Sequence, residues 1–255
     1  MKYFTIVLLV ANFWFGCAQD SISVNDIEIT TQLTFVEVQE SSKQKFEKAI
    51  SKLSLLAKEI KLKEDLDWLV YKFGTNKYLF INFSMDMGDV LKLKNYQDEF
   101  SKVGKATEFE IIIHELKFCE FVITRNFLQE MLLPWSSVKA ISVTKHPLTT
   151  MIEFSIYPKY MNEFDQRTRQ LAKLLKETNY SYPLEGNRGS LGAYSSVFHI
   201  WFYDDEMQGD INDHLEDWIA KKGKLQEFKT IMKSIETTIH LKKEYQLKYL
   251  PNLSY

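Results

Sequence analysis

The chain is poor in the residues that mark unusual architectures, because its 255 residues include only 2 cysteines, 9 glycines and 5 prolines. So little glycine and proline excludes collagen-like and low-complexity chains. Neither charge sign dominates, since 32 lysines and arginines nearly balance 34 aspartates and glutamates. Without a net positive field, binding to nucleic acid is not expected. The 45% of hydrophobic residues predicts a folded protein with a sizeable core.

Motifs that identify a specific chemistry are also missing. The sequence has no His-Glu-x-x-His, no Cys-x-x-Cys, no Gly-x-Ser-x-Gly and no phosphate loop ending in Gly-Lys-Ser or Gly-Lys-Thr. No metal site and no cofactor are therefore predicted. The function has to be inferred from the fold and from weaker groups of residues.

The first 18 residues have the layout of a secretory signal peptide. Lys2 supplies a positive charge, an apolar stretch follows over residues 3–15, and small residues end it. The stretch is too short for a convincing membrane span. With Gly16 and Ala18 in the small-residue positions of a cleavage site, the mature chain begins at Gln19. The sequence thus predicts an exported protein.

A second interpretation of this segment makes the protein a lipoprotein. Phe15, Gly16 and Cys17 form an imperfect lipobox, after which Cys17 would become the acylated first residue. The protein would then be attached to a membrane, and the expected location is the periplasm or the outer membrane. Either cleavage leaves Cys119 as the only unmodified thiol, which excludes an internal disulfide. Cys119 alternates with apolar residues, and we expect it to be buried in the core.

An internal repeat organises the rest of the chain. At a spacing of 118 residues, the positions Phe46, Leu53, Leu56, Lys58, Glu59, Gly74, Phe80 and Asp86 recur as Phe164, Leu171, Leu174, Lys176, Glu177, Gly192, Phe198 and Asp204. Further along, the spacing grows to 126 residues, and at this spacing His114 corresponds to His240. These two histidines could form a paired metal or acid–base site, but we favour a structural role for each at a helix end. A repeat of this length predicts a duplicated unit.

The hydrophobic patterns of the two halves predict the same elements in the same order. Each half begins with a short alternating strand and continues with a helix whose apolar positions are three and four residues apart. Two strands, a second helical region and a last strand follow. The expected order is βαββαβ twice, which describes two ferredoxin-like units with helices on one face of each sheet.

An apolar sheet face left bare by the helices must be covered. We therefore expect an α+β fold in which two ferredoxin-like βαββαβ repeats pack sheet to sheet as a pseudo-twofold pair. The predicted boundaries are a signal peptide over 1–18, a linker over 19–29, a first repeat over 30–135, a connection over 136–148 and a second repeat over 149–255. Because one chain supplies both halves, a monomer with an internal pseudo-twofold axis is expected.

The duplicated pattern, with a long first helix after a short strand and the ending Leu250–Tyr255, resembles the dimeric α/β-barrel superfamily. That group includes the antibiotic-biosynthesis monooxygenase-like and stress-responsive A/B barrel domains. The resemblance covers roughly residues 30–255, and the leader is similar to those of exported bacterial proteins. Resemblance to this superfamily implies a pseudo-dimeric α/β barrel, or a sandwich, that encloses a cleft between the halves. Relatives in the superfamily range from oxygenases to proteins of no known reaction.

One strand face of the second half is the predicted ligand site. His199, Trp201 and Tyr203 share a face that mixes an imidazole, an indole and a phenol, and a cleft needs such a mixture of apolar contact and hydrogen bonds. The opposite face, which carries Phe198, Ile200 and Phe202, is apolar and is expected to pack on helices. Arg188 lies between glycines in an expected loop and could add an anion contact.

These features predict an exported envelope protein that is not an enzyme. It would bind a small apolar or aromatic ligand in the cleft between its two repeats, or act as a scaffold. The alternative is a cofactor-independent or haem-dependent monooxygenase-like enzyme. Against an enzyme stands the lack of an ionisable partner for His199 on its strand face.

Cleavage at the small-residue site can be tested by replacing Cys17. With a mature N-terminus at Gln19, Cys17→Ala should leave the protein in the soluble envelope fraction, as in the wild type. N-terminal sequencing and membrane fractionation measure this. Release of the protein from membranes by Cys17→Ala would instead establish acylation of Cys17.

Overall fold

The computed structural model describes residues 27–62, 67–84, 93–138, 142–190, 196–204 and 211–255. The signal segment and Cys17 lie outside these residues. The first half contains β1 (Ile27–Val38), α2 (Lys43–Ile60), β2 (Trp68–Lys72), β3 (Lys77–Ser84), α3 (Leu93–Lys102), α4 (Ala106–Lys117) and β4 (Phe121–Leu132). The second contains β5 (Leu148–Ile156), α5 (Met161–Thr178), β6 (Leu184–Gly189), β7 (Ser196–Tyr203), α6 (Ile211–Lys221), α7 (Leu225–Thr238) and β8 (Ile239–Tyr249). None of the helices in the described ranges is long and apolar enough to cross a membrane.

The eight strands form one closed antiparallel barrel in the order β1-β3-β2-β8-β5-β7-β6-β4. Within each half, neighbouring strands pair over long stretches, whereas the two seams between the halves are short. Between β2 and β8, the paired residues are Tyr71 with Tyr249 and Lys72 with Lys248. Between β4 and β6, three residue pairs form the seam. The predicted α+β class is confirmed, with all eight strands in one sheet.

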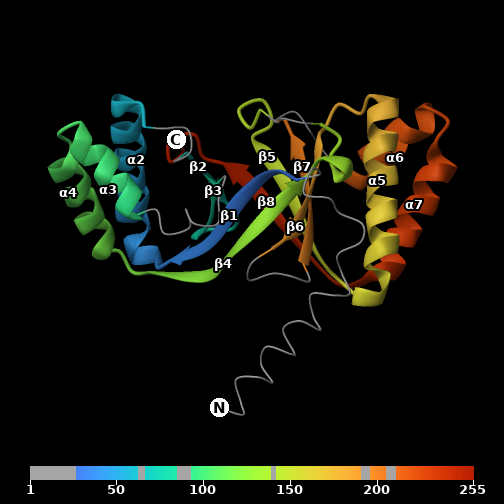
Figure 1. Cartoon of the computed structure of the whole chain (residues 1–255), viewed down its shortest axis with the longest axis horizontal. Coiled ribbons are helices and arrows are strands. Elements are labelled where there is room, and N and C mark those ends of the chain that lie inside the picture. The colour runs from blue at the N-terminus through green and yellow to red at the C-terminus, as the bar shows by residue number, and fades with distance from the viewer. Residues whose placement is uncertain (1–26, 63–66, 85–92, 139–141, 191–195, 205–210) are drawn as a thin grey trace, which may run out of the picture.

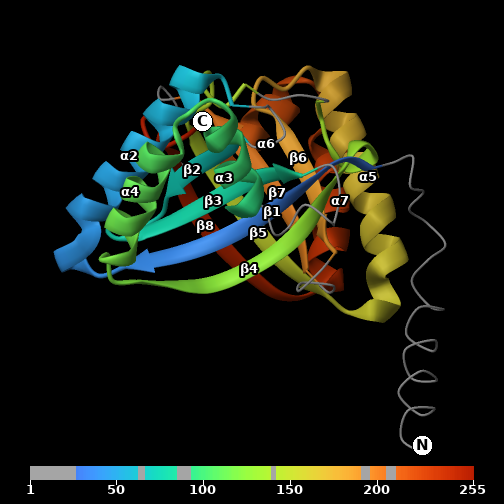
Figure 2. The ribbon, with the colours of Figure 1, turned by 60° about the vertical axis from the view of Figure 1, so that its left-hand side comes forward.

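Helices cover the barrel on two opposite flanks. Figure 1 shows α2, α3 and α4 on one flank and α5, α6 and α7 on the other, with the strands between them, and Figure 2 shows the same layers from the side. The bounds of α2 and α5 lie 118 residues apart, as the repeat predicts. Each helix is followed by a capping residue with a φ of 51°, Lys61 after α2 and Asn179 after α5, whose N–H closes the last turn.

Strand alternation divides the buried side chains into three cores. One core lies between the first flank of helices and the sheet, and a second lies beneath α5, α6 and α7. The third fills the barrel, because the inward side chains of strands from both halves meet there. Its buried members are Leu33, Phe35, Tyr71, Leu79, Phe127, Met151, Phe198, Ile200, Phe202 and Leu247.

The end of the first half differs from the prediction. The last strand of this half, β4, extends to Leu132 and is followed by the buried Trp135. The spacing of 126 is wrong, because β4 and β8 begin 118 residues apart. His114 therefore lies in the last turn of α4, whereas His240 lies in a strand. The two histidines are not equivalent positions.

Each half supplies its last residues to the core of the other half. Trp135, which follows β4, is fully buried beneath α5, and its indole N–H donates to Asp165 at 2.6 Å. Leu253, which follows β8, is buried in the core of the first half, and its carbonyl accepts a bond from the indole of Trp68 at 2.8 Å. This exchange ties the halves together beyond the two short seams.

An ion pair inside the barrel also joins the halves. Arg125 of β4 donates two hydrogen bonds to the carboxylate of Glu153 on β5, each 2.7 Å long. The guanidinium lies 5.3 Å from the ring centre of Phe35 and 4.9 Å from that of Phe127. The hydroxyl of Tyr245 lies 3.1 Å from Arg125 and 3.2 Å from Glu153. Such a bidentate pair between aromatic rings fixes the relative position of its strands.

Burial raises the pKa of Glu153, but Arg125, helped by Ser196 and Lys243, outweighs burial and lowers the pKa below its ordinary value of 4.5. A carboxyl whose pKa is lowered by folding stabilises the fold above its unfolded pKa. This stabilisation is lost as the pH falls through the folded pKa. The ion pair therefore contributes to stability at neutral pH.

Removing one partner of this pair should be costly. Arg125→Met should lower the free energy of unfolding by about 3–5 kcal/mol, because the carboxylate of Glu153 would stay buried without its partner. The double variant Arg125→Met/Glu153→Met should lose less. Urea unfolding at pH 7 measures both, and Lys102→Met, at an exposed pair with Glu99, should be nearly neutral. A double variant less stable than Arg125→Met would contradict this account.

Candidate functional site

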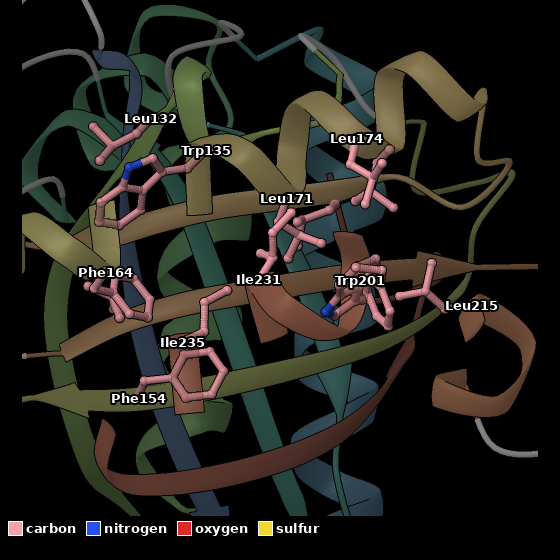
Figure 3. Close-up of a cluster of buried hydrophobic side chains, with 14 of the residues drawn as sticks. Leu132, Trp135, Phe154, Phe164, Leu171, Leu174, Trp201, Leu215, Ile231 and Ile235 are labelled. Carbon is pink, nitrogen blue, oxygen red and sulfur yellow. The ribbon is translucent and has the colours of Figure 1, made fainter. Parts of the chain in front are cut away.

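The predicted ligand face lies beneath helices. Trp201 and Tyr203 belong to the core under α5, α6 and α7, and 3% of His199 is exposed. Figure 3 shows Trp201 beside Leu215 and Leu171. The opposite face of β7, which carries Phe198, Ile200 and Phe202, points into the barrel. The predicted orientation is therefore reversed, and the ligand role of these three residues stays a prediction that the orientation does not support.

The reversal has a physical cause in the register. The repeat places Phe80 and Phe198 at equivalent positions, but Phe80 packs against the helix-side core whereas Phe198 lies inside the barrel. A shift of one residue moves every side chain of a strand to the other face. Polarity could not reveal the error, because the interior of a closed barrel is as apolar as the space beneath helices.

His199 is a buried, uncharged core residue. Its Nε2 lies 3.5 Å from the hydroxyl of Thr168, and its ring packs 5.1 Å from that of Phe154 and 5.8 Å from that of Phe164. Burial lowers the pKa of His199 to about 4. A histidine in this state would accept a proton only in strong acid, so it is a poor base for reactions near neutral pH.

Arg188 lies on a strand and not in a loop. It belongs to β6, and its guanidinium pairs with Glu130 of the neighbouring β4 on the outside of the barrel. Gly186 of the same strand is needed for packing, since a Cβ there would lie 2.3 Å from the Cβ of Trp135. Gly192 lies outside the described residues. The predicted anion contact of Arg188 is thus occupied by a carboxylate of the protein.

Three other residues that the sequence singled out, His114, His240 and Cys119, pack against side chains of the protein or are buried. His114 packs edge-on against Phe118 at 4.7 Å, and His240 packs against Tyr157 at 5.0 Å. Cys119 is buried as expected, and burial raises the pKa of its thiol. In the described part of the chain, no group of three or more histidine, cysteine, aspartate or glutamate residues could hold a metal ion.

The barrel interior contains a different ionisable group. Glu185 and Asn187 alternate on β6 and pair with Ile200 and Phe198, which belong to the inner core. The amide of Asn187 donates a hydrogen bond of 2.9 Å to the carboxylate of Glu185. Burial raises the pKa of Glu185, and this hydrogen bond offsets only part of the effect.

Several buried polar atoms near the same end of the barrel lack a partner. In the described residues, Oδ1 of Asn187 accepts no hydrogen bond. The same holds for Oε1 of Gln129 and the hydroxyl of Thr31 on adjacent strands. Buried polar atoms are almost always satisfied in proteins. A polar group of a bound molecule, or water, would satisfy them.

The inward side chains at this end also keep part of their surface accessible. Leu69, Ile81, Tyr249 and Glu185 are partly exposed, whereas the residues in the middle of the barrel are buried. They lie where β2 and β6 begin and where β3 and β8 end. We call this group, with Tyr71, Thr149 and Asn187, the barrel-end site. It offers one carboxyl, several hydrogen-bonding atoms and an apolar lining.

The sequence contains a signal for this site that its analysis missed. Glu185 and Asn187 are two residues apart, so in a strand they share a face. The glycines around them indicated a loop, so the alternation of Glu185 and Asn187 was not interpreted as a strand. Their meeting with Tyr71 and Thr149 depends on barrel closure, because these residues are far apart in the chain.

Comparison of the sequence with known proteins finds no relative, since no protein-family model and no curated protein matches it. Solved structures do match. A candidate monooxygenase from Fusobacterium nucleatum is 11% identical, with a TM-score of 0.56, over 87% of this chain and 93% of that one. A candidate monooxygenase from Lactobacillus acidophilus is 9% identical, with a TM-score of 0.52, over 87% of this chain and 94% of that one.

At such identities the likeness shows a shared fold alone, a closed antiparallel barrel flanked by helices. The comparisons also correct the predicted function. The sequence favoured a protein that is not an enzyme, whereas both matched structures are described as monooxygenases. The enzymatic alternative agrees better with this finding.

The buried state of His199 predicts acid sensitivity. The pKa of His199 is 6.5 in the unfolded chain and about 4 in the folded chain, so between these pH values the unfolded chain binds a proton that the folded chain does not bind. The free energy of unfolding therefore falls as the pH falls from 6.5 to about 4. Between pH 7 and pH 5, His199→Phe should lose about 2 kcal/mol less than the wild type. Urea unfolding at both pH values measures this. The exposed control His240→Gln should behave as the wild type, and an equal loss in His199→Phe would contradict the prediction.

Proposed function

We propose that the protein is a cofactor-independent monooxygenase-like enzyme that acts at the barrel-end site on a small aromatic substrate. One observation carries this proposal: the carboxyl of Glu185 lies among apolar barrel side chains and burial raises its pKa, whereas the carboxylate of Glu153 in the same barrel is paired with Arg125. Perturbed carboxyls in apolar surroundings are typical of catalytic acids and bases. The names of the two matched structures agree with an oxygenase.

In this proposal, Glu185 is the base. Its carboxylate removes a proton from an activated carbon of the substrate, and the amide of Asn187 holds the carboxylate in place at 2.9 Å. The electron-rich carbanion reacts with dioxygen, and return of the proton gives a hydroperoxide. Loss of water then forms a carbonyl, so that one CH₂ group and one O₂ become one C=O group and one H₂O. The apolar lining favours a flat aromatic substrate.

The haem-dependent form of the alternative does not fit the residues present. Among the inward strand residues that the structure describes, none is a histidine or a cysteine, which are the commonest haem ligands. Tyr71 and Met151 face inward, but both are fully buried among other side chains. We therefore assign no step to haem.

We also propose that the two halves are tandem ferredoxin-like repeats within residues 30–135 and 149–255, and that the mature chain acts in the cell envelope. Support for the repeats comes from the matching order of elements and from the common spacing of α2 and α5. Support for export comes from the pattern of residues 1–18. The envelope location would supply dioxygen and substrates from outside the cell.

The reaction can be tested with anthrone, a tricyclic ketone whose CH₂ group lies between two aromatic rings. The wild type should consume one O₂ per anthrone and form anthraquinone. Glu185→Gln should lower kcat at least about 100-fold, because the amide cannot accept the proton. An oxygen electrode and chromatography measure these quantities.

The matched control is Glu130→Gln, which removes a carboxylate from the outside of the barrel and should leave kcat unchanged. The activity of the wild type should rise with pH through the raised pKa of Glu185, since the base must be ionised. Wild-type kcat in a folded Glu185→Gln variant would exclude this base. A wild type no faster than Glu185→Gln with anthrone and related carbon acids would overturn the proposed reaction.

A further inference from the structure

The outer face of α2 and α4 carries an apolar groove of about 320 Å³. Leu55 of α2 and Ile111 of α4 line it, and they are 64% and 55% exposed. Leu56 and Ile112 form its base and are buried in the helix-side core. Figure 2 shows the two helices side by side on this flank. Two large aliphatic side chains thus stand in solvent on adjacent helices.

The second half provides an internal comparison. Leu55 of α2 corresponds to Lys173 of α5, because these helices begin and end 118 residues apart. Ile111 of α4 corresponds to Thr230 of α7, since the buried Phe109 and Ile112 match the buried Phe228 and Ile231 at the same spacing of 119.

Both second-half positions are polar, as expected for helices that face water. The side chain of Lys173 is 76% exposed and that of Thr230 is also exposed. The fold itself therefore does not require apolar residues at these places. Leu55 and Ile111 need another explanation, and exposed apolar clusters on one face mark interaction surfaces.

The charges around the groove have both signs. Lys52 lies 2.6 Å from Glu115 across the two helices. Lys105 lies 3.0 Å from Glu59 and 2.8 Å from Glu108. A rim of one sign would select a partner of the opposite sign. A mixed rim can face a copy of itself with lysines opposite carboxylates, so it is compatible with the self-complementary patch of a twofold interface.

The size of the face also suits a second copy. α2 has 18 residues and α4 has 12, so they are about 27 Å and about 18 Å long. With a width of about 10 Å each, they present roughly 450 Å² per copy. Two copies would bury about 900 Å², slightly below the roughly 1,000 Å² of a stable interface, which is the range of weak or transient dimers.

We propose that the α2–α4 face is a self-association surface, through which two copies of the chain form a twofold dimer. Leu55 and Ile111 of each copy pack against those of the other, and the four helices form a bundle across the axis. The modest area makes the dimer dependent on concentration. The proposed reaction does not depend on this surface, because the barrel-end site lies inside the barrel.

The test replaces Leu55 and Ile111 with the residue types found at the corresponding positions of the second half. Sedimentation velocity from 1 to 200 µM should show a dimer for the wild type and a monomer for Leu55→Lys/Ile111→Thr. The melting temperature should stay within about 2 °C of the wild type, because both side chains are exposed. Leu241→Lys, which alters an exposed leucine on β8, is the control and should remain dimeric.

A second measurement does not depend on these variants. Leu55→Cys, in a chain with Cys17 and Cys119 replaced by serine, should form a disulfide-linked dimer on mild oxidation, whereas Leu241→Cys should not. A wild type that stays monomeric at 200 µM, as the internal pseudo-twofold axis led us to expect, would overturn the proposal. Dimers that persist in Leu55→Lys/Ile111→Thr, or that dissociate in Leu241→Lys, would also overturn it.

Discussion

Closure of the sheet is the constraint on which the rest of this structure depends. In a closed barrel, the side chains of each strand alternate between the interior and the outer surface, and helices cover part of that outer surface here. Side chains from both halves therefore share a third core, in which Phe127 stacks on Phe198 at 5.3 Å. The same closure places Arg125 of one half against Glu153 of the other.

The halves depend on each other through their last residues as well. Trp135 is fully buried in the core of the second half, and Leu253 in the core of the first. Ser54 of α2 also donates a hydrogen bond to the carbonyl of Ser254. Since each half lacks part of its own core, the folding unit is the whole barrel. Large apolar surface would be exposed in either half alone.

The same interior that stabilises the barrel creates the conditions for chemistry at one end. The middle of the barrel is filled by rings and aliphatic side chains, so Glu185 loses hydration and its pKa rises. Tyr71 belongs to the same surroundings, and burial together with the charge of Glu185 raises the pKa of its phenol. The pKa of the Glu185 carboxyl is thus raised by the same apolar surroundings that stabilise the barrel.

The sequence by itself determined the α+β class, the matching helices α2 and α5 and the burial of Cys119, because amphipathic spacing and strand alternation are local properties. It could not decide which face of β7 points inward, since His199 and Phe198 differ by one residue and both surroundings are apolar. It also left Glu185 in an expected loop. Only the tertiary structure decided these points, because barrel closure sets the register and brings β2, β5 and β6 together around Glu185.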